Sequence, residues 1–164
     1  MKKIQLLLLS FCLCFTVLHA QTVTTGTFVK KIGDFEVFTN GEVFYRTMTK
    51  AHYDAIVAGN KLTASAETFT SPTQSYSEKY SGYLVKILVY LGTIDKLKVI
   101  GVSDGSADVK TKFGTMPVVA NGWGTTKAFF KSELGQVNIG LGTGTALTTF
   151  NANFKQYQLI KIIP

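Results

Sequence analysis

The sequence has 164 residues, of which 46% are hydrophobic, and its 17 lysines and arginines against 10 aspartates and glutamates give a formal net charge of +7. This length suits one domain with a sizeable buried core and leaves no room for a second domain. Both cysteines, Cys12 and Cys14, precede residue 20, so the rest of the chain has no disulfide, no cysteine nucleophile and no thiolate metal ligand.

The first twenty residues, MKKIQLLLLSFCLCFTVLHA, have the pattern of a secretory signal peptide: two lysines, an apolar stretch and a terminal Ala20. The apolar stretch is short for a membrane span and polar residues follow it, so we expect no stable membrane anchor. We expect residues 1–20 to be removed and residues 21–164 to form a single secreted or periplasmic domain. Omitting Lys2 and Lys3 lowers its net charge to +5, which favours anionic partners such as nucleic acid, lipid surfaces or nucleotide phosphates.

The first elements predicted are a β-hairpin and a helix. Asn40-Gly41 separates two runs rich in valine, phenylalanine and tyrosine, and both residues tolerate the positive φ of a tight turn. Arg46 then lies near the end of the second strand. Thr49 is suited to cap a helix through KAHYDAIVAG, which Gly59-Asn60 would end.

The middle of the chain predicts a second helix and a long strand. Ser71 is placed to cap the helix, Pro72 suits its first position, and Gly82 ends it. The run YLVKILVY, residues 83–90, is almost continuously apolar and β-branched, as expected for a strand covered on both faces at the centre of the sheet. The segment TIDKLKVIGV then indicates a turn and a short strand.

The last third of the chain predicts a long loop and three more elements. Residues 103–127 are rich in glycine, aspartate and asparagine and predict a loop, which in a compact domain is more often functional than idle. The stretch QVNIGLG then predicts a strand, ALTTFNANF a short helix and YQLIKII a closing strand. The predicted fold class is α+β, with a mostly antiparallel mixed sheet and a few short helices.

Three features invite a chemical interpretation. The glycines of GLGTGT, residues 140–145, would let backbone amides approach a phosphate, but the lysine and hydroxyl residue of a P-loop are missing, so close packing beside a strand is favoured. His52 is the only histidine of the expected domain, which excludes metal sites built on histidine pairs, and we expect no metal site. Trp123, Phe129 and Phe130 suggest a recognition surface, and the alternative is that Phe129 and Phe130 begin a core strand.

The order of the motifs carries a resemblance. FYR ends at Arg46, FTSPT surrounds Ser71, and GYLVKILVY precedes an aromatic loop that leads into KSELGQVNIGLG. This order resembles the ADP-ribosyltransferase toxins of the R-S-E branch, which have an arginine at the end of an early strand, an STS-like strand start and a catalytic glutamate after a substrate-recognising loop. The same stretches are similar to toxin domains at the ends of bacterial polymorphic toxins. The resemblance covers roughly residues 40–142.

The resemblance implies an ADP-ribosyltransferase-like fold and an exported toxin that cleaves NAD, its substrate, and transfers ADP-ribose to a protein. Arg46 would hold the phosphates and ribose of NAD, because its guanidinium is a planar, permanently charged fork. Ser71 would orient Arg46 and the nicotinamide side, and Thr70 and Tyr80 would complete the NAD-binding set. The implied partners are an unidentified target protein and an inhibitor or immunity protein.

Two residues compete for the catalytic position. Glu133 would hydrogen-bond the ribose and stabilise the positive charge that develops as nicotinamide leaves. Aligning QVNIGL with the family's catalytic strand instead places Gln136 there, and its neutral amide lacks that charge. Pro72 also stands where the STS motif has threonine. Both Glu133 and Gln136 therefore remain catalytic candidates, and we expect one of them to share a cleft with Arg46 and Ser71.

Two other functions remain open. A ribonuclease-type toxin is suggested by the basic charge and would use His52 with Glu133 as an acid/base pair; only this hypothesis makes nucleic acid a partner. A noncatalytic exported binding protein is suggested by the lack of a complete catalytic motif. It predicts a flat polar surface, whereas a deep pocket lined by Arg46 would count against it.

Overall fold

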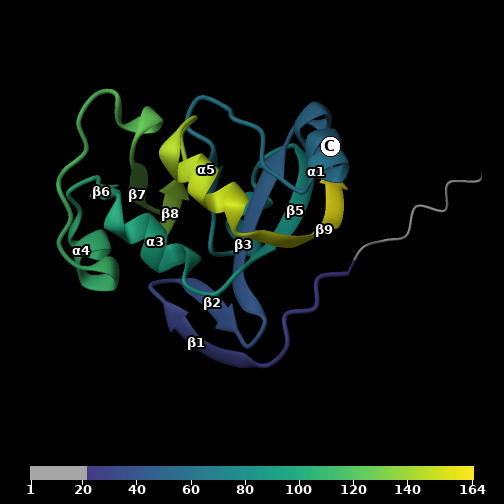
Figure 1. Ribbon diagram of the computed structural model, residues 1–164, viewed down its shortest axis with the longest axis horizontal. Helices are drawn as coiled ribbons and strands as arrows, with labels where there is room; N and C mark the ends of the chain where they lie inside the picture. The colour runs from purple at the N-terminus through teal and green to yellow at the C-terminus, as the bar shows by residue number, and fades with distance from the viewer. Residues whose placement is uncertain (1–21) are drawn as a thin grey trace, which may run out of the picture.

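The structure, a computed structural model, describes residues 22–164 and has an α+β fold (Figure 1). Its strands are β1 (Phe28–Ile32), β2 (Phe35–Phe38), β3 (Gly41–Met48), β4 (Phe69–Thr70), β5 (Gly82–Val89), β6 (Gly101–Ser103), β7 (Ala128–Glu133), β8 (Gln136–Gly140) and β9 (Phe154–Ile163). Its helices are α1 (Lys50–Gly59), α2 (Gln74–Ser77), α3 (Thr93–Val99), α4 (Ala107–Phe113) and α5 (Thr145–Ala152), with a 3-10 turn, η1 (Trp123–Thr125). The predicted fold class is confirmed. The expected signal peptide, residues 1–20, lies outside the described residues.

The strands form two sheets that meet at one point. The first sheet has the order β1-β2-β3-β5-β9 and is antiparallel throughout, and the second has the order β4-β8-β7-β6, in which only β6 and β7 are parallel. Tyr45 of β3 and Ser71, which follows β4, exchange two backbone hydrogen bonds of 2.8 Å. This contact places Arg46, the next residue of β3, beside the start of the second sheet.

The hairpin and the first helix form where the local signals predict them. Asn40 lies in the turn between β2 and β3, in which Val37 pairs with Glu42 and Phe38 with Gly41. Helix α1 begins after Thr49, whose hydroxyl accepts a hydrogen bond from the backbone N–H of His52, and ends at Asn60 in the left-handed conformation. Both predictions are therefore confirmed.

Strand β5 is covered on both faces, as predicted, but it is not the middle strand of its sheet. Leu84, Val85, Ile87, Leu88 and Val89 are all fully buried. The strand pairs with β3 on one side and β9 on the other, so β3 holds the central place of the five. The closing strand β9 occupies the edge next to β5.

The core between the sheets and helices is rich in phenylalanine. Phe44 of β3 packs against Phe35 of β2 and Phe150 of α5, with ring centroids 4.7 and 5.1 Å away. Phe130 of β7 packs against Phe113 of α4 at 5.0 Å. These contacts join elements of both sheets through a single cluster of buried side chains.

Helices α3 and α4 were not predicted from the sequence. Helix α3 forms where a turn was predicted before the short strand, and α4 forms inside the predicted long loop. In α3, which replaces the predicted turn, Ile94 and Leu97 are three residues apart and fully buried on one face. In α4, within the predicted loop, Val109 and Phe113 are four residues apart and buried, and the hydroxyl of Ser106 caps the first turn. Both helices have only seven residues, so they offer too few turns for a clear helical pattern.

The predicted helix cap at Ser71 is wrong. Thr73 precedes the helix instead, and α2 is a single turn of four residues, Gln74–Ser77. The backbone of Ser71 continues from β4 and pairs with Tyr45. A partner on a distant strand therefore decides the conformation of Ser71, and local capping preferences do not.

The glycines of GLGTGT allow another segment to pack closely against them, which was the interpretation favoured from the sequence. A Cβ atom on Gly140 would lie 2.9 Å from the Trp123 ring, and one on Gly142 only 2.1 Å from the carbonyl oxygen of Gly124. On Gly144 it would lie 2.0 Å from the carbonyl oxygen of Thr125. The absence of side chains here lets the loop that contains η1 lie directly against the connection from β8 to α5.

This packing predicts a stability difference between two glycines. Gly142 and Gly122 both have positive φ, +58° and +82°, but a Cβ atom on Gly122 would meet nothing within 4 Å. We expect Gly142→Ala to lower the free energy of unfolding by about 2–4 kcal/mol, through backbone strain and a clash, and Gly122→Ala by about 1 kcal/mol, through strain alone. Urea titration of both variants measures the difference, and equal losses would contradict the packing role.

Candidate functional site

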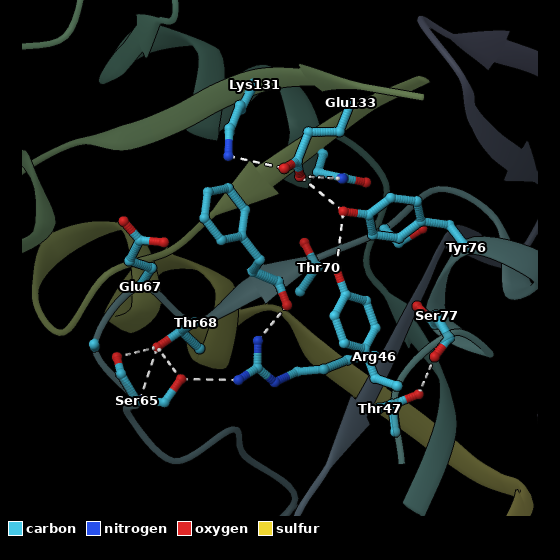
Figure 2. Close-up of a pocket in the computed structure, with 15 residues that line it drawn as sticks. Arg46, Thr47, Ser65, Glu67, Thr68, Thr70, Tyr76, Ser77, Lys131 and Glu133 are labelled. Carbon is cyan, nitrogen blue, oxygen red and sulfur yellow. Dashed lines mark hydrogen bonds and ion pairs between the residues drawn. The ribbon is translucent and has the colours of Figure 1, made fainter. Parts of the chain in front are cut away.

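A cleft of about 610 Å³ opens where the two sheets meet, between β3, β4, α2 and the end of β7 (Figure 2). Its lining is mainly polar and aromatic: Arg46, Thr47, Ser65, Ala66, Glu67, Thr68, Phe69, Thr70, Ser71, Tyr76, Ser77, Tyr80, Lys131, Glu133 and Asn138. The size falls within the range of small-molecule and cofactor sites. The cleft thus brings together Arg46, Ser71 and Glu133, which are far apart in the sequence.

Arg46 enters the cleft because of its place on β3. Successive strand residues point to opposite faces, so Arg46 shares the inner face with the buried Phe44 and Met48. Its guanidinium donates hydrogen bonds to the carbonyl oxygen of Phe69 and, at 2.8 Å, to the hydroxyl of Ser65. The hydroxyl that orients Arg46 therefore belongs to Ser65, whereas the prediction named Ser71.

The charge of Arg46 has no acidic partner in the part of the chain that the structure describes. Within residues 22–164, no carboxylate forms an ion pair with its guanidinium. Burial lowers the pKa of Arg46 to about 10, which still leaves it protonated at neutral pH. A buried cation with only neutral acceptors is costly unless an anion completes its surroundings. Arg46 is therefore suited to bind a phosphate or carboxylate of a ligand.

Glu133 lies at the end of β7, on the other side of the cleft from Arg46 in Figure 2. One carboxylate oxygen, Oε1, accepts a hydrogen bond from Lys131 at 2.8 Å. The other, Oε2, accepts from the Tyr76 hydroxyl at 2.8 Å and from the Asn138 amide at 3.0 Å. Its side chain is still 32% exposed, so a ligand can reach it.

The hydrogen bonds of Glu133 keep it ionised. Partial burial raises the pKa of Glu133, but the hydrogen bonds from Lys131, Tyr76 and Asn138 outweigh burial and hold the pKa below its ordinary value of 4.5. Burial, followed by the hydrogen bonds to Tyr80 and Glu133, raises the pKa of Tyr76 well above its ordinary value, so its phenol stays a donor. Glu133 is therefore a fixed negative charge at neutral pH and a weak general base.

The hydrogen bond from Tyr76 predicts a shift in the pKa of Glu133. Replacing Tyr76 with phenylalanine removes one donor to the carboxylate, so the pKa of Glu133 should rise in the variant. A depressed pKa in the folded state contributes stability above the unfolded pKa, and that contribution is lost as pH falls through the folded pKa. NMR titration of the Glu133 side-chain carboxyl carbon measures its pKa in the wild-type protein and in the variant. An unchanged or lower pKa in Tyr76→Phe would contradict the assigned hydrogen bond.

Gln136 does not line the cleft and is buried behind Ser71. Its amide nitrogen donates to the Ser71 hydroxyl at 2.9 Å and to the Asn138 side-chain oxygen at 2.6 Å. Its amide oxygen accepts from the hydroxyl of Thr73. The side chain of Gln136 is thus committed to internal partners on three sides. Its geometry is that of a residue that holds Ser71 and Asn138 in place.

Thr70 and Tyr80, the other two residues predicted to bind NAD, differ in whether a ligand can reach them. The hydroxyl of Thr70 donates to the carbonyl oxygen of Ile139 at 3.0 Å, and the residue is 2% exposed, so it fastens β4 to β8. Tyr80 is 53% exposed at the mouth of the cleft, and its hydroxyl lies 3.1 Å from that of Tyr76. Tyr80 is therefore accessible to a ligand, whereas the hydroxyl of Thr70 is already used.

Several residues that line the cleft were not predicted as site residues from the sequence. Lys131 precedes Glu133 by two positions on β7, and Asn138 follows Gln136 by two positions on β8. Residues two apart on a strand share a face, so this spacing was the available signal. Ser65, which orients Arg46, lies in the connection between α1 and β4 and had no such signal.

The remaining candidates lie outside the cleft. His52 is in the first turn of α1, does not line the cleft and forms no ion pair with a carboxylate among the described residues. Phe129 and Phe130 begin the core strand β7, and the Trp123 ring packs on Phe129 with centroids 5.1 Å apart. The described chain holds no group of three or more side chains suited to a metal ion, and none of its helices has the length and hydrophobicity of a membrane span.

Comparison with known proteins identifies the family. The model of the PT3 toxin domain matches residues 40–159, a segment that begins at the β2–β3 turn and contains every residue of the cleft. A comparison with curated proteins gives no match. The matched segment is well over half of the 164 residues. The chain therefore belongs to the PT3 toxin-domain family.

Proposed function

We propose that this toxin domain cleaves NAD and transfers the ADP-ribosyl group to a protein target. The observation that carries the proposal is that one cleft holds both Arg46, which has no acidic partner in the described part of the chain, and the ionised Glu133. NAD presents the matching chemistry, since it has an anionic pyrophosphate and a ribose that becomes positively charged when nicotinamide leaves. The motif order FYR, SPT and KSE that resembles the R-S-E toxins gives additional support.

Arg46 would bind the pyrophosphate. Its guanidinium is held by the Phe69 carbonyl and the Ser65 hydroxyl, so its orientation is fixed before the ligand arrives. Its other N–H groups have no partner within residues 22–164 and can make charge-assisted hydrogen bonds to phosphate oxygens, which are about twice as strong as neutral ones. A fixed cation also avoids the entropy cost of ordering a flexible side chain on binding.

Glu133 would stabilise the reacting ribose. The bond between the ribose anomeric carbon and the nicotinamide nitrogen breaks, the electron pair leaves with nicotinamide, and positive charge develops on the sugar. A preplaced carboxylate lowers the energy of that charge. A nucleophilic side chain of the target then forms the new bond to the same carbon and loses its proton to solvent.

Glu133 is the better catalytic candidate of the two. Its carboxylate is charged and faces the cleft, whereas the neutral amide of Gln136 is buried behind Ser71. In this proposal Gln136 is a positioning residue, because its amide bonds the side chain of Asn138, which in turn bonds Glu133. Tyr80 would contact the ligand at the cleft mouth.

The biological setting is proposed on the same basis. An exported toxin with an intracellular substrate requires delivery to the target cell, and an inhibitor or immunity protein would protect the producing cell. The expected signal peptide, residues 1–20, would direct export. The ribonuclease hypothesis gains less support, because His52 lies outside the cleft that holds Glu133. The binding-protein hypothesis also gains less support, because it predicts a flat surface where the structure has a cleft lined by Arg46.

The transfer reaction is tested with NAD that is labelled in its adenylate half. The purified protein is incubated with this NAD and a cell extract, and the extract proteins are then separated. We expect label on one or a few proteins, and none with Arg46→Ala. Degradation of RNA that persists in Arg46→Ala but disappears in His52→Ala, without labelled protein, would favour the ribonuclease instead.

A further inference from the structure

Lys131 forms an ion pair with the proposed catalytic carboxylate inside the cleft. The two side chains project from the same face of β7, with Lys131 Nζ 2.8 Å from Glu133 Oε1 (Figure 2). The side chains are 38% and 32% exposed. The Lys131 ammonium also lies 5.7 Å from the centroid of the Phe69 ring, and the backbone carbonyl of Phe69 accepts from Arg46. Lys131 is thus a second cation of the same cleft.

This ion pair opposes the function proposed for Glu133. An ammonium in contact with the carboxylate cancels much of the negative potential that the carboxylate would apply to a developing positive charge. Glu133 would act more strongly if a ligand removed Lys131 from it. Partly exposed ion pairs are weak, so a dianionic group brought into the cleft can compete for the lysine.

Lys131 has the freedom to move that Arg46 lacks. Two neutral protein groups fix the guanidinium of Arg46, whereas Glu133 Oε1 is the one hydrogen-bond acceptor of Lys131 within residues 22–164. An ammonium has three donors on a flexible four-carbon stem. Two of its donors therefore remain for a ligand, and rotation of the flexible stem can change the position of the ammonium.

We propose that Lys131 is a second phosphate-binding residue of the cleft and that a bound pyrophosphate draws it away from Glu133. The inference rests on the proposed function for the identity of the ligand. Arg46 provides the fixed phosphate contact and Lys131 the mobile one. Substrate binding thereby removes Lys131 from Glu133 at the moment when the ribose is in place, and before binding the ion pair offsets the charge of Glu133.

A double-mutant cycle with ADP as the probe tests this coupling. ADP carries the pyrophosphate but has no nicotinamide to lose, so calorimetry measures binding without chemistry. We expect Lys131→Gln to weaken ADP binding about tenfold in the wild-type background. The loss should be larger in the Glu133→Gln background, because there the lysine binds phosphate without first leaving a carboxylate. A loss below about twofold, or one that is not larger without Glu133, would overturn the proposal.

Two controls separate this effect from others. Lys110→Gln removes the same charge from an exposed position on α4, outside the cleft, and should leave ADP affinity within about twofold. Adenosine, which has no phosphate, should bind Lys131→Gln as well as it binds wild type. Thermal unfolding of each variant checks that the fold is intact.

The same titrations distinguish failure of this inference from failure of the proposed function. If ADP binds wild type, depends on Arg46 and does not depend on Lys131, the second phosphate contact is wrong and the nucleotide cleft stands. If ADP does not bind wild type at all, the nucleotide cleft is wrong and the role of Lys131 falls with it.

Discussion

Arg46→Ala is expected to lower kcat/KM for NAD cleavage by at least about 100-fold. The proposed contacts to the pyrophosphate are charge-assisted hydrogen bonds, each worth about 1.5–3 kcal/mol, and about 1.4 kcal/mol corresponds to tenfold. Two such contacts account for the expected loss. Most of it should appear as weaker NAD binding, because the pyrophosphate is remote from the bond that breaks. Calorimetry with NAD measures the loss of binding, and steady-state release of nicotinamide measures the loss of kcat/KM.

Arg46→Lys is the matched control for this prediction. Lysine keeps the positive charge but lacks the planar fork that bonds the Phe69 carbonyl and the Ser65 hydroxyl and that would also bond a phosphate in the proposed function. We expect it to recover only part of the activity. Full activity in Arg46→Ala, with an intact fold by circular dichroism, would show that the arginine is not a ligand-binding residue.

Glu133→Gln is expected to lower kcat by about 100–1000-fold and to leave NAD binding in place. Glutamine keeps the size of the side chain and its amide oxygen can accept the hydrogen bonds from Tyr76 and Asn138, so the substitution removes the charge together with its ion pair to Lys131. Loss of one electrostatic stabiliser of a transition state has effects of this order. Single-turnover release of nicotinamide at saturating NAD isolates the chemical step.

Glu36→Gln and Gln136→Ala complete the comparison. Glu36 is a carboxylate on β2, outside the cleft, and its removal should leave kcat within about twofold. Gln136→Ala removes the hydrogen-bond donor of the buried Asn138 side-chain oxygen, so it should lower the free energy of unfolding by about 1–3 kcal/mol. If Gln136→Ala abolished release in a folded protein while Glu133→Gln kept it, the catalytic position would be Gln136.

The elements that the sequence predicted correctly have strong local signals. The Asn40-Gly41 turn and the Thr49 cap depend on the conformational preferences of a few neighbouring residues, and the structure has both. Strand β5 is recognisable because burial on both faces demands an unbroken apolar run. The seven-residue helices α3 and α4 were missed, because their apolar pairs Ile94/Leu97 and Val109/Phe113 repeat only once.

The features that the sequence did not reveal depend on contacts between distant segments. Ser71 is a strand residue because it pairs with Tyr45 of another strand, and Ser65 orients Arg46 from a connection without regular structure. The choice between Glu133 and Gln136 also depended on side-chain direction, since only Glu133 lines the cleft. Motif order placed Arg46, Ser71 and Glu133 together. The two-residue spacing of Lys131 and Glu133 on one strand was the signal for their ion pair, and the sequence analysis did not use it.

The most direct test of the central claim is nicotinamide release from NAD by the purified protein, measured beside Arg46→Ala and Glu133→Gln. We predict release by the wild-type protein, and its loss in both variants with their folds intact. A wild-type protein that neither releases nicotinamide nor binds NAD by calorimetry would contradict the claim that this cleft is an NAD site.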